Sequence, residues 1–396
     1  MKIFATTTTH ARGGRLSPVV IPCLFAAAFF WPLASRAQDN PSLRIDEDVT
    51  SFAFSSSGRI AYGARHVFSV KKIQLQRDDI WIAEPDGKKR RILLGEKFVR
   101  GTGPFSYTVR GLRWAPDGNK LAVDLGTSEM INDDGDTREG VMTLLLDDTG
   151  REIQIEGGDS TIPGASNPAW MADGATVVYL TGEQSDQKPS SPSAPAPKVL
   201  AANLVKPLVG GKSSLFAGHM FSAVVWDPNR SAGVAIEHAA NAGNTTGPAP
   251  LVVLDPMRNV LRTVATLEGY AGGLTLSPSG KKVAYWVNNE QLEVRDMDFP
   301  DRAARVRIAL GTAVWGANEA RVVVKRGPLR RSGDLVLVTL PPLNAVAAGS
   351  APKLTEVVPQ SILHGLQFRG FDTTPDGRSL AVVEPGKRNL YVYPLP

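Results

Sequence analysis

One short phrase recurs seven times along the 396-residue chain: an apolar-alternating segment, a polar turn and a second apolar-alternating segment. RWAPDGNKLAVDLG (113–126) is a clear example, with its PDG turn between the two segments. Proline presets φ for a tight turn, aspartate caps the turn and glycine adopts the positive φ. Each phrase therefore predicts a β-hairpin, and the seven copies are 49–64, 109–125, 166–181, 221–237, 271–287, 311–326 and 368–384.

Glycine occupies the last turn position in five of these copies, as Gly58, Gly118, Gly174, Gly280 and Gly377. In the copies 221–237 and 311–326, Arg230 and the glycine-less pair Asn318-Glu319 replace it. Only glycine adopts positive φ without a steric cost, so we expect these two turns to be built differently.

A weaker second pair of strands follows the hairpins, again joined by polar or glycine turns. Examples are 78–94, 141–155, 250–267, and 333–340 with a partner near 353–358. Four antiparallel strands repeated at intervals of roughly 40 to 60 residues are typical of a propeller blade. The alternative of a two-sheet sandwich does not explain why one phrase recurs seven times.

The phrase resembles the repeat of TolB-type β-propellers. RWAPDGNKLAV (113–123), PAWMADGATVVY (168–179) and TTPDGRSLAVV (373–383) carry the resemblance best, whereas the copies 221–237 and 311–326 depart from it at the turn. It spans nearly all of residues 38–396 and is specific for fold rather than for activity. Together, pattern and resemblance predict an all-β, seven-bladed β-propeller of four-stranded antiparallel blades.

The last unit ends with RNLYVYPLP (388–396), which leaves it one outer strand short. Residues 42–46 (SLRID) alternate apolar with polar just before the first hairpin. We therefore expect this N-terminal strand to complete the last blade, because closure removes the exposed edges of an open array.

Residues 1–37 have the organisation of a secretory signal peptide. Basic residues precede an apolar run at 19–34, and the small residues Ser35 and Ala37 frame a cleavage site after Ala37. We expect residues 38–396 to form a single propeller domain that is periplasmic or secreted. An uncleaved anchor is the alternative.

Removing this segment changes the charge and the thiol content. Four of the 44 Lys and Arg residues and none of the 39 Asp and Glu residues lie in 1–37, so the formal net charge falls from +5 to +1. This balance does not indicate a nucleic-acid partner. The single cysteine, Cys23, is also lost, and no later apolar run reaches membrane-spanning length. We expect a monomer without a membrane span after cleavage.

The connections of a blade open on two different faces. The two hairpin turns lie on one face, here the turn face, while the connection between the second and third strands and the link to the next blade lie on the other, the long-loop face. The long segments 63–77, 126–140, 182–198, 238–249 and 326–333 therefore gather on the long-loop face. Segment 182–198 is rich in Pro and Ser and is expected to be mobile.

Function on a rigid scaffold is usually carried by loops, so the long-loop face is the candidate binding surface. Its charged residues and histidines are Lys71, Lys72, Asp133, Asp134, Asp136, Glu237, Arg326, Arg330 and Arg331 together with His66, His219, His238 and His364. The alternative is a solvated loop surface with tolerated insertions.

No catalytic motif is present. The chain lacks a G-x-S-x-G elbow, Lys206 occupies the position where GGKSS (210–214) would need a glycine, and INDDGDT (131–137) lacks the order of a calcium loop. Trp114, Trp170, Trp226 and Trp315 recur at one repeat position and indicate blade packing. We therefore expect no catalytic, cofactor-binding or metal-binding residues.

The predicted function is a non-catalytic protein-interaction scaffold, with an envelope or extracellular protein as the partner on the long-loop face. The alternative is a propeller enzyme, or a small-ligand or metal-binding protein, with a site at the channel mouth. A cluster of His66, Asp124, Glu237 and His238 about one pocket would favour that alternative.

Overall fold

The recurring phrase forms the first two strands of every four-stranded sheet in the computed structural model. These antiparallel pairs are β2 (Val49–Phe54) and β3 (Ile60–Ala64), β8 (Phe105–Trp114) and β9 (Lys120–Met130), β12 (Ala165–Trp170) and β13 (Thr176–Thr181), β16 (Met220–Asp227) and β17 (Ala232–His238), β20 (Ala271–Leu276) and β21 (Lys282–Val287), β24 (Ala313–Trp315) and β25 (Arg321–Lys325), and β28 (Gly370–Thr373) and β29 (Ser379–Val383).

The structure describes residues 41–100, 104–131, 136–155, 158–181, 198–203, 213–216, 219–227, 230–238, 248–267, 269, 271–316, 319–325, 335–340, 343, 360–361, 370–384 and 386–395. The predicted signal peptide, 1–37, lies outside these ranges. So does the predicted mobile loop, 182–198, except for Lys198, which begins a strand. No helix within the described ranges is long and apolar enough to cross a bilayer.

The turns have the backbone conformations that the sequence predicts. Gly58, Gly118, Gly174, Gly280 and Gly377 all have positive φ. In the two copies without this glycine, Ser231 (φ 49°) and Glu319 (φ 51°) adopt the left-handed conformation instead. Because L-residues adopt it at a steric cost, these two turns are locally less favourable than the other five.

The outer strands complete the sheets. They are β6 (Asp79–Ala83) and β7 (Lys89–Leu93), β10 (Thr137–Asp147) and β11 (Thr161–Pro163), β14 (Lys198–Asn203) and β15 (Ser213–Leu215), β18 (Ala249–Asp255) and β19 (Val260–Leu267), β22 (Gln291–Asp296) and β23 (Ala303–Arg307), β26 (Leu335–Thr339) and β27 (Gln360–Ser361), and β30 (Leu390–Pro394) with β1 (Leu43–Ile45).

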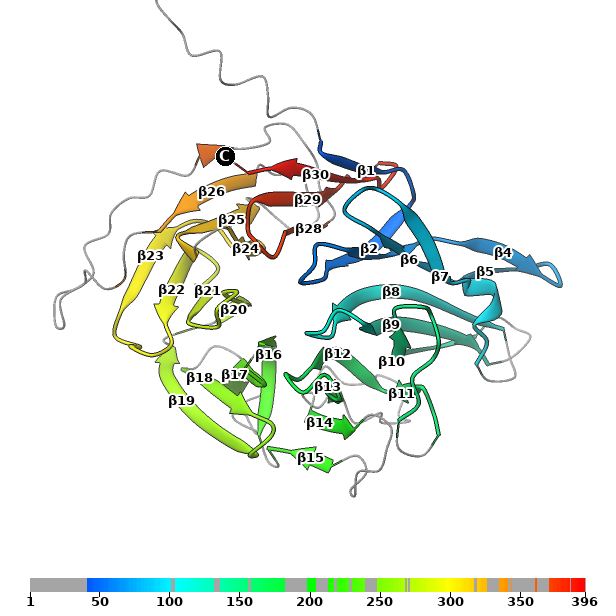
Figure 1. The fold of residues 1–396 in the computed structure, drawn as a ribbon. Coiled ribbons are helices and arrows are strands. Elements are labelled where there is room, and N and C mark those ends of the chain that lie inside the picture. Colours follow the sequence, from blue (N-terminus) through cyan, green and yellow to red (C-terminus); the bar gives the residue numbers. More distant parts are fainter. Residues whose placement is uncertain are drawn as a thin grey trace, which may run out of the picture. The chain divides into compact units, whose positions relative to one another are not determined.

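Seven four-stranded antiparallel sheets result in the described part of the chain, and Figure 1 shows them arranged radially about a centre. The predicted all-β propeller of antiparallel blades is therefore confirmed. In the last sheet β1 pairs with β30, with Leu43 opposite Val392 and Ile45 opposite Leu390.

Two outer strands differ from the prediction. Residues 151–155 do not form the outer strand beside β10, and Glu152 makes only an isolated bridge to Leu146. Ile155 instead turns inward and is buried in the core between the β8–β11 and β12–β15 sheets, so β11 takes the edge. The second predicted strand, 353–358, lies outside the described residues, and β27 pairs with β26.

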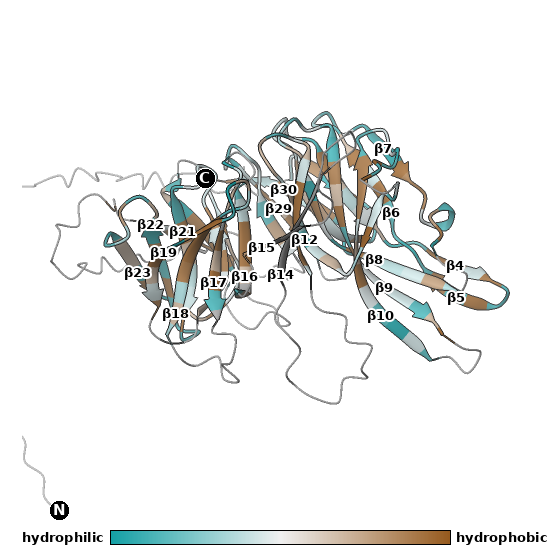
Figure 2. Ribbon diagram, turned by 90° about the horizontal axis from the view of Figure 1, so that it is seen from below, coloured by the Kyte–Doolittle hydropathy of each residue, from teal (hydrophilic) through white to brown (hydrophobic). Residues whose placement is uncertain are grey.

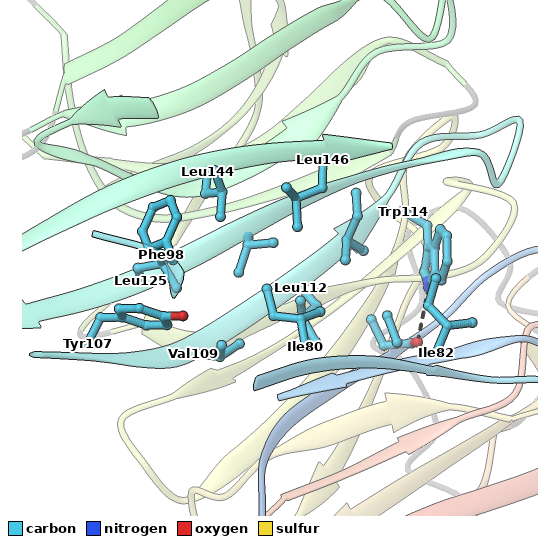
Figure 3. Packing of buried hydrophobic residues seen from close by; sticks show 14 of the residues in the cluster. Ile80, Ile82, Phe98, Tyr107, Val109, Leu112, Trp114, Leu125, Leu144 and Leu146 are labelled. Atoms are coloured by element: carbon cyan, nitrogen blue, oxygen red, sulfur yellow. Dashed lines mark hydrogen bonds between the residues drawn. The ribbon is translucent and has the colours of Figure 1, made fainter. Parts of the chain in front are cut away.

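Apolar side chains hold neighbouring sheets together face to face. Figure 3 shows Ile80 and Ile82 of β6 packed against Val109 and Leu112 of β8, in a buried cluster between the β2-β3-β6-β7 and β8–β11 sheets. The Trp114 indole N–H in this cluster donates to the Ala53 carbonyl at 3.2 Å. Full burial of such side chains contributes about 1.5–3 kcal/mol each, which makes these interfaces the main source of stability.

Candidate functional site

The long-loop face carries a hairpin where the sequence pattern predicts a loop. Residues 63–77 contain β4 (Val67–Val70) and β5 (Ile73–Gln76), joined by Lys71 (φ 49°) and Lys72 (φ 71°). Val67 and Val70 are 51% and 44% exposed, and both lysines are exposed. Positive φ at both turn residues is normally provided by Asn-Gly, so two lysines here are locally unfavourable and place two positive charges at the tip.

The base of this hairpin is fixed to β8. The Gln76 backbone N–H donates to Ser106 Oγ at 3.2 Å, and its side-chain amide donates to Thr108 Oγ1 at 3.1 Å. Buried Asp78 accepts from Gln76 Nε2 at 3.1 Å and from the Val109 N–H at 2.8 Å. Burial raises the pKa of Asp78, although these hydrogen bonds favour its charged form. The base is therefore rigid and holds the exposed tip in place.

A second arm is formed by β9 and β10, which pair over eleven residues each, from Lys120 opposite Asp147 to Met130 opposite Thr137. This strand pairing replaces most of the loop predicted at 126–140. Ile131 at its end is exposed, and Glu129 and Arg138 form an ion pair of 2.7 Å. In Figures 1 and 2 the β4–β5 and β9–β10 hairpins lie beside each other and extend beyond the neighbouring strands.

The histidines of the predicted surface lie in separate clusters. His66 Nδ1 is 3.3 Å from Asp79 Oδ1, and its Nε2 is 3.0 Å from Glu96 Oε1. His219 Nδ1 is 2.5 Å from Glu237 Oε1 in the β16–β19 sheet. His66 and His219 therefore each have at least one carboxylate partner near their own sheet rather than facing each other.

The remaining predicted residues are placed in part. Asp136 lies at the start of the β10 side of its arm, where its carbonyl accepts from the Ile131 N–H at 2.9 Å. The backbone of His238 pairs with Met220. The others lie outside the described residues: Asp133, Asp134, Arg326, Arg330, Arg331 and His364.

Three members of the cluster that would favour an enzyme have described side chains, and these three, His66, Asp124 and Glu237, lie in or beside three different sheets. Asp124 accepts from the Asn167 N–H at 3.2 Å, whereas His66 and Glu237 have the partners given above. Burial raises the pKa of Asp124, and the Asn167 N–H and two arginines oppose that rise. Among the described residues, no group of three or more His, Cys, Asp or Glu could hold a metal ion.

Two adjoining cavities of about 450 and 430 Å³ lie at the opposite face, where the innermost strands end at their PDG-type turns. Trp114 and Trp170 line the first, Trp315 lines the second, and Trp226 and Asp372 line both. Volumes of 300–1,000 Å³ are typical of small-ligand sites. The tryptophans interpreted as packing residues therefore also form the wall of the channel mouth at the turn face.

Asp372 is the acidic group shared by the two cavities. Its side chain is exposed to the channel, but protein surrounds that channel, and its Oδ1 accepts from the Thr373 N–H at 2.8 Å. Desolvation raises the pKa of Asp372, opposed by the Thr373 N–H and by the positive charge of Arg113. None of the ion pairs within the described ranges involves Asp372.

No motif marks these channel residues in the sequence, although the repeats contain a signal for them. The position before the recurring tryptophan is neutral in five sheets, as Ala53, Ala169, Val225, Thr275 and Val314. It is charged only in the remaining two, as Arg113 and Asp372. A charge at one position of an aligned repeat was therefore visible in the sequence, but its place in the channel was not.

Comparison with known proteins supports the fold and goes no further. No protein-family model matches the chain, and no curated protein matches it. Solved structures do resemble it, and one of them is described as a β-propeller domain.

One is a chain from the "Crystal Structure of Mitotic Checkpoint Complex", with a TM-score of 0.55 and 12% identity, covering 96% of this chain and 99% of that one. Another is the Cps50 (Swd1) β-propeller domain of Myceliophteria thermophila, with a TM-score of 0.55 and 13% identity, covering 90% of this chain and 99% of that one. Because the identities are low, the likeness shows the β-propeller fold alone.

Proposed function

We propose that this protein is a non-catalytic protein-interaction scaffold that binds its partner through the long-loop face. The observation that carries this proposal is the pair of projecting hairpins, β4–β5 and β9–β10. The β4–β5 hairpin presents exposed Val67 and Val70 on a fixed base, and the β9–β10 hairpin presents exposed Ile131. Apolar contacts of this kind contribute strongly to protein–protein affinity.

The charges of the two arms indicate which charges the partner's binding surface carries. Lys71 and Lys72 make the tip of β4–β5 basic, while Asp136 and Glu139 lie on the β9–β10 arm. A partner with an acidic patch facing the first arm and a basic patch facing the second fits both, and such complementarity speeds association and selects against other partners.

Three further features belong to the same proposal. The ring has seven blades and is closed by β1, which the pairing of β1 with β30 supports. The chain is a TolB-like propeller, which the PDG-turn phrase supports. It is exported after cleavage at Ala37, so its partner is an envelope or extracellular protein, which the pattern of residues 1–37 supports.

Site-specific photo-crosslinking in the producing cell tests the binding surface. A photoreactive amino acid at Val70 or at Ile131 should capture the same discrete protein. One at Met257, which is equally exposed on the β18–β19 turn of the turn face, should not.

Purified complexes then test the charges. Replacing Lys71 by Asn and Lys72 by Gly removes both charges and gives the turn its preferred residues, so the hairpin should remain folded. We expect affinity for the captured partner to fall by about tenfold. Equal capture from Met257, or unchanged affinity of the Asn-Gly variant, would refute the proposal.

A further inference from the structure

The second of the two cavities at the turn face is acidic. Asp227 and Asp372 are the charged residues that line it, among Trp226, Trp315 and neutral side chains. Asp227 is 4% exposed and lies 3.7 Å from the Arg230 guanidinium, whereas Asp372 faces the channel without an ion pair in the described part of the chain. The cavity therefore offers one channel-facing carboxylate to a ligand.

The aromatic wall of this cavity differs from that of its neighbour. In the first cavity a cation already lies over two of the rings: Arg59 is 5.0 Å from the Trp114 centroid, and Lys120 Nζ is 5.8 Å from the Trp170 centroid. Both cations come from the preceding sheet and occupy the same repeat position: Arg59 precedes Ile60, which pairs with Phe54, and Lys120 precedes Leu121, which pairs with Trp114. The corresponding residue before Trp226 is Thr176, because Trp170 pairs with Val177 as Trp114 pairs with Leu121.

Trp226 therefore has no cation over its ring among the described residues, although it lines both cavities, as Asp372 does. A tryptophan face is the most favourable aromatic surface for a cation, and the attraction increases when the pair is shielded from water. A carboxylate within the same cavity adds a charge-assisted hydrogen bond to an N–H donor.

We propose that the second cavity binds a single guanidinium or ammonium group on a short aliphatic stem, with Asp372 as the anionic contact and Trp226 and Trp315 as the aromatic wall. A cavity of about 430 Å³ accommodates one such side chain, but not a folded surface. The site lies on the turn face and is separate from the long-loop surface to which the scaffold function is assigned.

Arg113 defines the direction from which the cation binds. It lines the first cavity and is exposed there, but it does not line the second. A bound cation is therefore repelled toward the second cavity, and removal of the Arg113 charge should strengthen binding. A site that merely collected cations by net charge would show no such dependence on one residue.

Calorimetric titration of the protein at pH 8 tests the proposal, with tryptophan fluorescence as a second signal. The probes are the tripeptide acetyl-Gly-Arg-Gly-amide, its neutral counterpart acetyl-Gly-Gln-Gly-amide, and free agmatine. We expect the arginine peptide or agmatine to bind and the glutamine peptide not to bind. Binding of the peptide indicates a protein-borne side chain, and binding of agmatine alone indicates a small amine.

Variants identify the contacts. Asp372→Asn should weaken binding by at least about tenfold, while Asp301→Asn, an exposed carboxylate on the β22–β23 turn, should not change it. Trp226→Leu should weaken binding by roughly three- to tenfold, and Arg113→Gln should strengthen it. Thermal unfolding of each variant checks the fold.

The proposal is wrong if the glutamine peptide binds as well as the arginine peptide. It is also wrong if Asp372→Asn and Asp301→Asn have equal effects, or if no probe binds the unaltered protein. Should Asp372→Asn fail to fold, Trp226→Leu and Arg113→Gln decide the question, because they predict changes of opposite sign.

Discussion

Replacing Ile45 by alanine tests whether the N-terminal strand closes the ring. Ile45 is 0% exposed and lies in one apolar cluster with Ile60 and Tyr62 of the first hairpin and with Leu390 of the last sheet. The cluster therefore joins the beginning of the chain to its end. If β1 closes the ring, removal of this single side chain should lower the free energy of unfolding substantially.

The size of the effect follows from burial. Ile→Ala removes the equivalent of about three buried methylene groups at ~0.8 kcal/mol each, and the cavity left behind adds to that loss. We expect Ile45→Ala to lower the free energy of unfolding by about 3 kcal/mol. Amide hydrogen exchange in β28 and β30 should also become faster, because the sheet loses an edge strand.

Denaturant titration followed by tryptophan fluorescence and circular dichroism measures this change. Arg44→Lys is the matched control, since Arg44 lies on the same three-residue strand, is exposed and pairs with Asp46 in solvent. It should leave the midpoint unchanged. If Ile45→Ala shifts the midpoint no more than this control, β1 does not close the ring and the reasoning fails.

Two further substitutions test the interior. Glu293→Gln should lower the free energy of unfolding by roughly 2–4 kcal/mol at pH 7. This range is already reduced for solvent screening, because Arg305, whose Nε lies 2.6 Å from Glu293 Oε2, is half-exposed. Burial alone would raise the pKa of Glu293, but the Tyr285 hydroxyl and the two arginines outweigh it and lower the pKa. The Glu293 contribution to stability is thus present above pH 4.5 and lost as the pH falls through the folded-state pKa. In urea titrations at pH 7 and pH 3, the variant should therefore lose less stability on acidification than the unaltered protein. An equal loss in both proteins would contradict this role of Glu293. Gly280→Ala should lower the free energy of unfolding by roughly 1–3 kcal/mol, since φ is 69° and a Cβ would lie 2.1 Å from Asp227 Oδ2. Gly386→Ala is the control and should be neutral, because nothing lies within 4 Å of its Cβ. Equal melting temperatures of the two variants would contradict the prediction.

The repeated hairpins could be predicted from the sequence because their signals are local. A turn such as PDG acts within four residues, and period-two alternation assigns each side chain to one face of a strand. The copies at 109–125 and 368–384 became β8–β9 and β28–β29 for this reason. In the two departing turns the left-handed conformation falls instead on Ser231 and Glu319, against their local preference.

Only the tertiary structure determined the edges, the arms and the channel. Outer strands such as β11 and β27 are two or three residues long and depend on neighbours distant in sequence, so burial of Ile155 could displace the predicted strand. The arm β4–β5 is held by hydrogen bonds to β8 that no local pattern encodes. Asp372 and Trp226 line the same cavity only because the radial arrangement brings neighbouring repeat positions of distant strands to a common centre. Local propensity specifies each hairpin, whereas convergence of separate hairpins is a property of the ring.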